Sequence, residues 1–383
     1  MSPSPLPHSG GDDRLTATSG FVSVETSAGR QRLSAQQYAD AAALVQPDIV
    51  IALHDAANAI DGAKRHQRAQ QRSLKWLDQC LAALASGSSS GATGGSSDGH
   101  VHGGWDLARR RLSASEVAKR NVAGFVITGV GRTQTQPQTP LELHAAIAAS
   151  VAALPPRLPR TVHGADTPFD MLAAIAAGAD AVHSAWAHAL TKAGRAFVAR
   201  LDMPSAPPWE GGSDAAAARD GGGGTARQQQ QQRLVAGVQG TEAAAAGLRN
   251  AEGTGGNWAH SSGGTKLQHI ATAAPGQQQF ATAAVAASDA AELSGIVINL
   301  WDARYRRDAR PLAERCACAA CRDHTRAYTQ HLLRAREMAA DVLLQAHNVE
   351  HCLAFLARVR RSVAGGWFEE YRAWWESGGA RVE

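Results

Sequence analysis

The sequence predicts an α/β protein with a mainly parallel sheet, because short apolar runs alternate with stretches of helical periodicity. Residues 49–53 form one such run, typical of a strand buried on both faces, and residues 64–85 follow with leucines at helical spacing. Residues 125–127 form another buried run, which ends in Gly129 and Gly131. With 44% hydrophobic residues the chain can bury a sizeable core. No apolar run reaches the roughly eighteen residues that span a bilayer, so we expect no membrane insertion.

The next elements have boundary signals of their own. Thr167 predicts a helix start as the N-cap, with Pro168 in the first turn and Asp170 near the positive end of the helix dipole. Residues 171–177 continue this helix, and residues 181–182 are the next expected strand. Repeated strand-helix units of this kind indicate a parallel sheet.

Three segments fall outside this pattern because their composition favours flexibility. Residues 1–20 are rich in Pro, Ser and Gly, residues 86–100 are rich in Gly and Ser, and residues 205–280 are dominated by Gly, Ala and Gln. Such tracts lack the apolar surface that offsets the entropy lost on ordering. We therefore predict a flexible N-terminus and two flexible insertions, which leave residues 21–204 and 281–375 as the folded parts.

A cysteine cluster provides the strongest chemical signal. Cys316, Cys318 and Cys321 form a CxCxxC pattern, and His347 follows after a helical stretch. Three thiolates and one imidazole are a closed tetrahedral set that suits zinc and leaves no position for substrate water. A disulfide framework is the poorer interpretation, since a CxC pair bridges only with strain and the N-terminus has no secretory signal. The sequence predicts one structural zinc ion in a reducing compartment.

Two helices are expected around His347. Residues 327–344 would form the helix that leads back to it, and residues 349–363 an amphipathic closing helix. The basic end of the closing helix contains Arg358, Arg360 and Arg361. Cys80 and Cys352 fall on apolar helical patterns, and we interpret both as core residues.

The residues around the cluster resemble the zinc subdomain of the tRNA-guanine transglycosylase family. The matching sequence segments are residues 298–305, 308, 310–312, 316–321, 325–328, 331–333, 337–338 and 347–348. Looser matches lie upstream, at residues 27–30, 47–53 and 160–194, so the resemblance covers about two thirds of the chain in separate blocks. It implies a (β/α)8 TIM-type barrel with a zinc-binding subdomain inserted late. This barrel would be N-terminally incomplete, with its first strands missing and the strand before His102 replaced by the Gly/Ser tract.

The resemblance also locates the family's catalytic loop. Active members attack the ribose of a tRNA guanosine with an aspartate, because an oxocarbenium-like centre requires an anionic nucleophile. In the matching word here, Asp180 retains the first aspartate, but His183 stands at the nucleophile position. Ala189 stands where the family has an arginine. Two losses in one loop predict that this site does not catalyse the exchange, so we assign no catalytic residue.

The base-recognition words differ as well. Leu53-His54-Asp55 replaces Phe-Asp-Glu, and His102-Gly103-Gly104 replaces Gln-Gly-Gly. The family's second acidic group, in an Asp-Ser-Gly-Gly word, has only a superficial counterpart at residues 8–11, where His8 takes the acidic position. Residues 122–125 and 348–351 resemble the accessory branch of the family instead of its catalytic branch.

Membership of the accessory branch implies a non-catalytic subunit that pairs with a catalytic subunit. The pair would exchange guanine for queuine at the wobble position of tRNAs with GUN anticodons, which decode Asp, Asn, His and Tyr. The resemblance also implies a cytoplasmic protein, with peripheral association with the mitochondrial outer membrane. The alternatives are an active transglycosylase, a standalone zinc-dependent RNA-binding module, and a truncated non-functional gene product.

Two residue sets near the cluster have open roles at this point. Seven arginines either contact tRNA phosphates or form ordinary ion pairs with the acidic residues among them; they are Arg304, Arg306, Arg307, Arg310, Arg315, Arg322 and Arg326. Five apolar residues either anchor a subunit interface or pack the core of their own subdomain; they are Tyr305, Tyr328, Leu332, Leu333 and Phe355.

Overall fold

The computed structural model describes residues 20–26, 29–55, 57, 61–87, 96–130, 139–204 and 293–382. All of them belong to one unit, composed of Met1–Ala206 and Ala271–Glu383. The second unit, Pro207–Ile270, lies outside the described residues, as do residues 1–19 of the predicted flexible N-terminus and the whole predicted insertion at 205–280.

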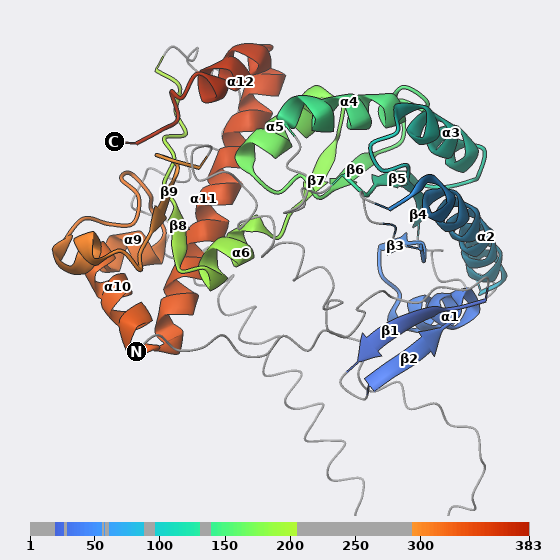
Figure 1. Ribbon diagram of the computed structural model, residues 1–383, viewed down its shortest axis with the longest axis horizontal. Helices are drawn as coiled ribbons and strands as arrows, with labels where there is room; N and C mark the ends of the chain where they lie inside the picture. The colour runs from blue at the N-terminus through green and yellow to red at the C-terminus, as the bar shows by residue number, and fades with distance from the viewer. Residues whose placement is uncertain are drawn as a thin grey trace, which may run out of the picture. The chain divides into compact units, whose positions relative to one another are not determined.

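A five-stranded parallel sheet forms half of a TIM-like barrel, which confirms the expected α/β class (Figure 1). Its strands pair in chain order; they are β3 (Ile49–Ile51), β4 (Ser96–Val101), β5 (Gly124–Ile127), β6 (Arg160–His163) and β7 (Ala181–His183). The central strand β5 is buried along its whole length, as the sequence predicted. Because all five strands run in the same direction, their carboxyl ends meet at one edge, where a barrel of this type places its loops.

Helices cover the outer face of the half-barrel (Figure 1). They are α2 (Ala63–Gly87), α3 (Leu107–Ala118), α4 (Pro140–Val151) and α5 (Pro168–Ala176). Phe125, Ile127 and Ile147 are completely buried in the core between sheet and helices. Thr167 and Asp170 form a capping box at the start of α5 with Pro168 in the first turn, so this predicted helix start is confirmed.

Two strand predictions were wrong. Strand β3 is not buried on both faces, since Ile49 is 59% and Ile51 is 36% exposed; its only pairing partner in the described sheet is β4. The predicted Gly/Ser insertion at 86–100 overlaps a real strand, because β4 occupies residues 96–101. Gly99 belongs to this strand because of its packing and not because of flexibility. A Cβ there would lie 2.5 Å from Val117 Cγ1, so only glycine lets α3 pack this close to the sheet.

An N-terminal hairpin and helix precede the half-barrel. Strands β1 (Val22–Thr26) and β2 (Gly29–Leu33) pair antiparallel, and α1 (Ala35–Val45) packs against α2. Trp76 and Cys80 on α2 are completely buried beside this element, which confirms the core assignment of Cys80.

The C-terminal part combines a two-stranded sheet with a group of helices. Its elements are α6 (Trp186–Lys192), β8 (Arg195–Phe197), β9 (Val297–Asn299), the 3-10 helix η4 (Ala303–Arg307), α9 (Ala319–Asp323), α10 (Arg326–Ala335), α11 (Met338–Ala364) and α12 (Phe368–Glu376). The single helix predicted over 327–344 is wrong, because Arg336 adopts a left-handed conformation and ends α10. The predicted closing helix at 349–363 is the second half of α11. Among the described helices, none has both the length and the apolar character needed to cross a bilayer.

Candidate metal centre and strand-end loops

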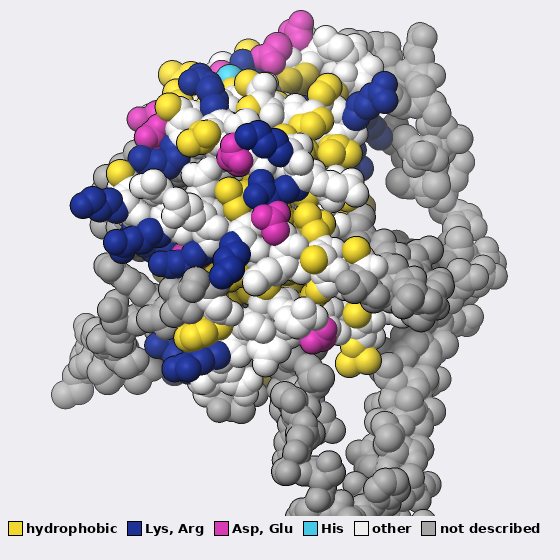
Figure 2. All heavy atoms as spheres, turned by 90° about the vertical axis from the view of Figure 1, so that its right-hand side faces the viewer, with side chains coloured by type: hydrophobic (Ala, Val, Ile, Leu, Met, Phe, Trp, Pro, Cys, Tyr) yellow, Lys and Arg dark blue, Asp and Glu magenta, His cyan; other side chains and the backbone are white. Residues whose placement is uncertain are grey.

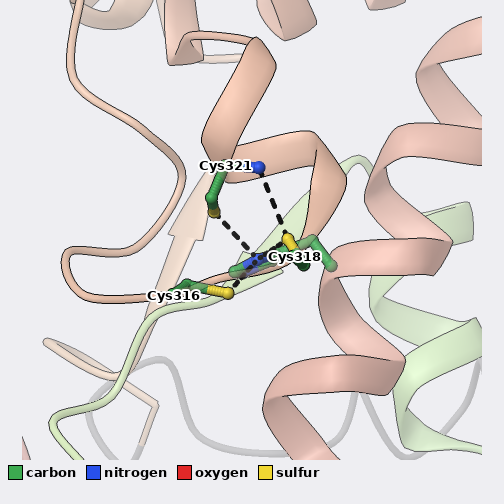
Figure 3. Close-up of side chains that lie close together, drawn as sticks. Cys316, Cys318 and Cys321 are labelled. Atoms are coloured by element: carbon green, nitrogen blue, oxygen red, sulfur yellow. Dashed lines mark hydrogen bonds between the residues drawn. The ribbon is translucent and has the colours of Figure 1, made fainter. Parts of the chain in front are cut away.

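The structure brings the four predicted ligands together from three elements. Cys316 lies in the loop before α9, Cys318 caps the first turn of that helix, and Cys321 lies within it. His347 projects from the middle of α11, and its Nδ1 is 3.6, 3.6 and 3.3 Å from the sulfurs of Cys316, Cys318 and Cys321. The cysteine side chains point toward one another (Figure 3), and the four donor atoms all lie within 4.8 Å of each other.

The other nitrogen of His347 fixes the ring for ligation. Nε2 lies 2.7 Å from the carbonyl oxygen of Phe197 on β8, and the ring is completely buried. A carbonyl accepts only, so Nε2 carries a proton, and Nδ1 is the nitrogen that faces the sulfurs and would ligate a metal once it is deprotonated. The metal set therefore includes the outer hydrogen bond that orients a ligating histidine.

The protonation chemistry of the cluster favours a cation. Hydrogen bonds from Cys316 and then Cys321 lower the pKa of the Cys318 thiol, so a thiolate is stabilised there. Burial alone would lower the pKa of His347, but hydrogen bonding to Cys318 and Cys321 outweighs it and raises the pKa to about 9. A metal ion would replace the shared protons, since it neutralises thiolates in the same position. Three sulfurs and one nitrogen at these separations fit a closed four-coordinate ion.

Asp180 has a structural role at the opposite end of the sheet. Its carboxylate accepts hydrogen bonds from the Arg160 backbone N–H at 2.9 Å and from its Nε at 2.7 Å. Both residues lie at the N-terminal ends of their strands β6 and β7, where barrel residues contribute to stability and not to catalysis. His183 occupies the C-terminal end of β7, and Ala189 is completely buried in α6. The catalytic loop thus presents no carboxylate from position 180, 183 or 189.

Asp55, the one carboxylate retained in the base-recognition motifs, is held in ion pairs with α2. Asp55 is 1% exposed and forms ion pairs with Arg65 Nη2 at 2.6 Å and Arg72 Nη1 at 2.7 Å, both on α2. The backbone N–H of His102 donates to Ser113 Oγ at 3.0 Å, which ties the second word to α3. These loops are therefore fastened to the outer helices.

Asp166 is an acidic residue at the C-terminal end of the half-barrel that the sequence did not single out. It is half-buried between β6 and α5, and its Oδ1 accepts a hydrogen bond from Ser184 Oγ at 3.3 Å. Burial, and then the negative charge of Asp170, raise the pKa of Asp166 to about 6. No sequence pattern marks it, because the shift depends on tertiary burial.

The raised pKa of Asp166 predicts a pH-dependent mutant effect. The folded state holds this proton more tightly than the unfolded state, so the stability it provides is complete below pH 4 and is lost as pH rises through 6. Asp166→Asn mimics the protonated form, so we expect it to be more stable than wild type at pH 8 by about 1 to 2 kcal/mol, with a smaller gain at pH 5. Urea unfolding at both pH values measures this. Asp180→Asn is the control and should lose stability at pH 8; an equal gain for Asp166→Asn at both pH values would contradict the assignment.

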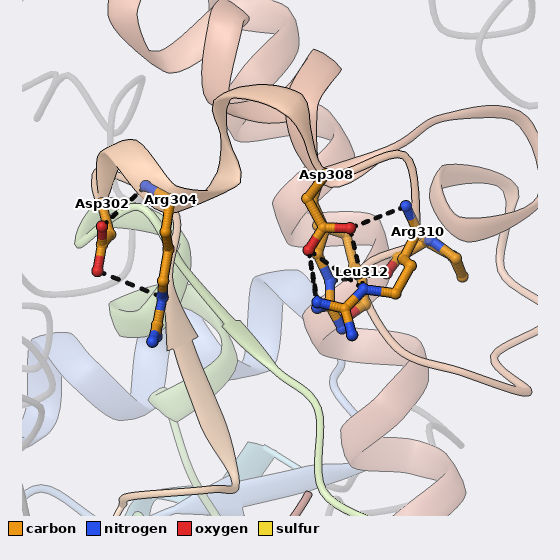
Figure 4. A network of polar contacts seen from close by, with 7 residues as sticks. Asp302, Arg304, Asp308, Arg310 and Leu312 are labelled. Carbon is orange, nitrogen blue, oxygen red and sulfur yellow. Dashed lines mark hydrogen bonds and ion pairs between the residues drawn. The ribbon is translucent and has the colours of Figure 1, made fainter. Parts of the chain in front are cut away.

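The arginines near the cluster divide into two groups. Arg304 pairs with Asp302, and Arg310 with Asp308 at 2.8 Å (Figure 4). Arg326 is buried, pairs with Asp308 and donates to the carbonyls of Pro311 and Leu312, so it has a structural role. Arg322 pairs with Asp323. The remaining three are exposed and have no ion pair among the described residues; they are Arg306, Arg307 and Arg315.

Four of the five predicted interface anchors belong to the protein's own core. Tyr305, Leu332 and Leu333 pack in the core of the cysteine cluster, and Phe355 packs against the aromatic core of α11 and α12. Only Tyr328 is substantially exposed, at 44%. Four apolar residues aligned on α11 are also exposed; they are Met338, Val342, Val349 and Leu353. Their spacing of four, seven and four residues follows the helical repeat, and this signal was readable in the sequence.

Comparison with known proteins now identifies the family. The family model described as "Queuine tRNA-ribosyltransferase" matches residues 8–378. The chain belongs to the queuine tRNA-ribosyltransferase family. Within this family, the Gallus gallus protein named queuine tRNA-ribosyltransferase accessory subunit 2 is 30% identical over 90% of this chain and 68% of its own length. The proteins of the same name from Ixodes scapularis and Homo sapiens are 30% and 28% identical over 91% and 90% of this chain, and over 71% and 70% of their own lengths.

A protein without the accessory designation matches a shorter part of the chain. The queuine tRNA-ribosyltransferase of Ruegeria pomeroyi is 39% identical, but over only 22% of this chain. The long matches given above are to accessory subunits of the family, which confirms the resemblance to the accessory branch that residues 122–125 and 348–351 indicated.

Proposed function

We propose that the chain is the non-catalytic subunit of a heterodimeric queuine tRNA-ribosyltransferase, which supports exchange of guanine for queuine at the wobble position of tRNAs with GUN anticodons. One observation carries the proposal: His183, at the C-terminal end of β7, stands at the family's nucleophile position. The chain is similar to an accessory subunit over nine tenths of its length. The Asp180 carboxylate is hydrogen-bonded to Arg160, so it is not available as a substitute nucleophile. An active transglycosylase is the alternative.

The exchange reaction itself tests this function. We expect the purified chain to incorporate no labelled queuine or guanine into tRNA, and to support incorporation when the catalytic subunit of the same organism is added. His183→Asp should not restore activity to the isolated chain, because Ala189 still stands where the family has an arginine and Asp55 stays paired to α2. Measurable incorporation by the isolated wild-type chain would favour the active transglycosylase.

We also propose that the Cys3His cluster holds one zinc ion. Thiolate and imidazole donors in a closed set are the ligands of structural zinc sites, and softer or harder ions prefer other sets. Cys316, Cys318, Cys321 and His347 would hold the ion, whose chemistry is to cross-link α9 to α11 and not to activate water. For location we propose the cytoplasm, with peripheral attachment to the mitochondrial outer membrane; release of the protein from isolated mitochondria by an alkaline carbonate wash would separate attachment from insertion.

The partner surface is proposed to be the exposed apolar stripe of α11, formed by Met338, Val342, Val349 and Leu353. Met338 is 85% exposed and Val342 is 66% exposed. Exposed apolar side chains aligned along one helix mark an association surface better than single ones, because burying them together removes a continuous apolar area from water. The basic residues Arg306, Arg307 and Arg315 lie in the subdomain that α11 supports.

We expect a charged substitution on this stripe to weaken the complex with the catalytic subunit. Leu353→Asp adds a charge at a half-exposed apolar position, and we expect it to weaken one-to-one association with the catalytic subunit at least tenfold without unfolding the chain. Leu112→Asp is the matched control, since Leu112 is 56% and Leu353 is 53% exposed and Leu112 lies on α3 of the half-barrel. Sedimentation of the mixed proteins measures the complex. Equal weakening by both substitutions would remove the stripe from the interface.

For tRNA, we propose contact through unpaired basic side chains. Figure 2 shows Lys and Arg side chains gathered on the face of the molecule where α2 and α3 lie. Lys64, Arg68 and Lys75 on α2 and Arg111 on α3 are exposed, and none has an ion pair among the residues that the structure describes. Exposed cations without acidic partners are free to neutralise phosphates and release counterions. With the unpaired arginines of the subdomain, they supply the sequence-independent part of tRNA binding.

A further inference from the structure

Arg110 on α3 is a buried cation without a carboxylate partner. Its side chain is completely buried and holds the segments that follow β4 and β5. Nε donates to the carbonyl oxygen of Gly104 at 2.6 Å, and Nη2 donates to the carbonyls of Thr128 and Gly129, both at 3.0 Å. Burial lowers the pKa of Arg110 to about 9, and no carboxylate among the described residues opposes that shift. Because a buried guanidinium is normally paired with an anion, this one requires an explanation.

Three nitrogens in this region are buried without a hydrogen-bond partner among the described residues. They are Nη1 of Arg110, Nδ1 of His66 on α2, and Nε2 of His102, which directly follows β4. His66 and His102 are each 4% exposed. Buried polar atoms in folded proteins nearly always have a partner, so three such nitrogens on neighbouring side chains indicate a missing acceptor.

The three side chains lie close to one another. His102 and Arg110 both contact Thr128, since Nδ1 of His102 lies 3.3 Å from the Thr128 hydroxyl and Arg110 donates to the Thr128 carbonyl. Burial lowers the pKa of both His66 and His102, and the positive charges of Arg110 and Arg65 lower both pKa values further. Both imidazoles are therefore within range of the same two guanidinium groups.

The charge balance of the region decides which kind of acceptor is missing. Asp55 pairs with Arg65 at 2.6 Å and with Arg72 at 2.7 Å, so this carboxylate already serves two cations. Asp61 acts on an imidazole of the group but not on Arg110. The charge that is left without compensation is positive. An anion would neutralise it, whereas a water molecule would only accept the hydrogen bonds.

We propose that Arg110, His66 and His102 bind a chloride ion. A monatomic anion accepts hydrogen bonds from any direction, so it suits one guanidinium and two imidazole N–H groups that come from different elements. Thr128 donates to Nδ1 of His102 by rotation of its hydroxyl, which leaves the proton of that ring on Nε2. A tetrahedral oxyanion suits the site less well, because these nitrogens are closed to water and offer little space. The ion would connect α2 to α3 and to the loop after β4.

The test measures equilibrium unfolding in urea as a function of chloride. Zinc is supplied as the acetate, and gluconate replaces chloride so that ionic strength stays constant. Because unfolding releases the ion, the unfolding constant of wild type is expected to fall about tenfold for each tenfold rise in chloride above the Kd. An unfolding constant that does not change with chloride would overturn the proposal.

Two phenylalanine variants separate this site from chloride bound elsewhere. His66→Phe keeps a ring but removes the N–H donor, and we expect it to need at least ten times more chloride for the same stabilisation. His144→Phe, on the half-buried histidine of α4, is the matched control and should respond as wild type does. The same chloride dependence in both variants would contradict the site.

A crystal of the wild-type chain grown with bromide decides the matter if His66→Phe does not fold. Bromide replaces chloride and is located by its anomalous scattering. The expected peak lies between Nη1 of Arg110 and Nδ1 of His66. A water molecule at that position, or no density there, would refute the proposal.

Discussion

Replacing Cys318 by serine is expected to release the bound ion and to unfold the C-terminal part from about residue 298 to residue 363. Cys318 supplies one of the four donors, and its sulfur also accepts the Cys321 N–H at 3.4 Å as the cap of α9. A structural zinc ion contributes on the order of 10 kcal/mol to folding, which is comparable to the total stability of many domains. Metal analysis and thermal unfolding of both proteins measure the effect.

The control for this experiment is Cys352→Ser. Cys352 is half-buried on α11 and lies outside the cluster, so the same exchange of sulfur for oxygen should leave the zinc content at one ion from the Cys3His set and cost far less stability. Well-folded wild-type protein without zinc at the four residues would contradict the proposed role of the cluster. Equal loss of metal in both variants would show that the cysteines act through packing alone.

The cysteine cluster and the central strands could be predicted because their signals are local. The CxCxxC spacing and His347 define a ligand set wherever the chain folds, and residues 125–127 are apolar enough to be buried in any sheet. The cap at Thr167 acts within one helical turn. In each case the residues that decide the structure lie close together in the sequence or carry a chemistry that few arrangements satisfy.

The wrong predictions depended on contacts between distant residues. From the sequence, Gly99 belongs to a flexible tract. In the structure its missing side chain allows the close approach of Val117, eighteen positions away in the chain. Ile49 reads as buried, yet the strand order places it at an edge. Arg336 ends α10 in a left-handed conformation without the glycine that usually marks such an end. Residue type alone does not report any of these.

Burial also decided the role of residues beside the metal centre that the sequence had left open. Tyr305 and Leu332 could either anchor an interface or pack the core, and the structure packs them around Cys318 and Cys321. The metal centre is joined to the two-stranded β8-β9 sheet by hydrogen bonds that no sequence pattern predicts. His347 contacts the carbonyl oxygen of Phe197, and the adjacent Asn348 accepts from the Phe197 N–H at 2.9 Å. Two consecutive residues of α11 thus hold both polar groups of one residue in β8.

Asn348→Leu is therefore expected to destabilise the protein by about 4 kcal/mol, although the two side chains have the same number of heavy atoms and the same branching. The Asn348 amide is completely buried, and its Nδ2 also donates to Thr191 Oγ1 at 3.1 Å and to the Arg195 carbonyl at 3.0 Å. Leucine leaves the buried N–H of Phe197 and the carbonyl of Arg195 without these partners, and each loss costs about 1 to 3 kcal/mol. Urea unfolding with zinc present measures the difference.

Gln345→Leu on the same helix is the matched control and should have the opposite sign. The Oε1 atom of Gln345 is buried without a hydrogen-bond partner, so replacing this amide by leucine removes an unpaired polar atom instead of creating two. We expect stability to stay unchanged or to rise by up to about 1 kcal/mol. Both substitutions exchange a side-chain amide for leucine in α11, and helix propensity does not explain a loss in either, since leucine is a helix former at least as good as glutamine and better than asparagine. Equal destabilisation by both would mean that α11 tolerates no leucine at these positions, and that the Asn348 hydrogen bonds are not what joins it to β8.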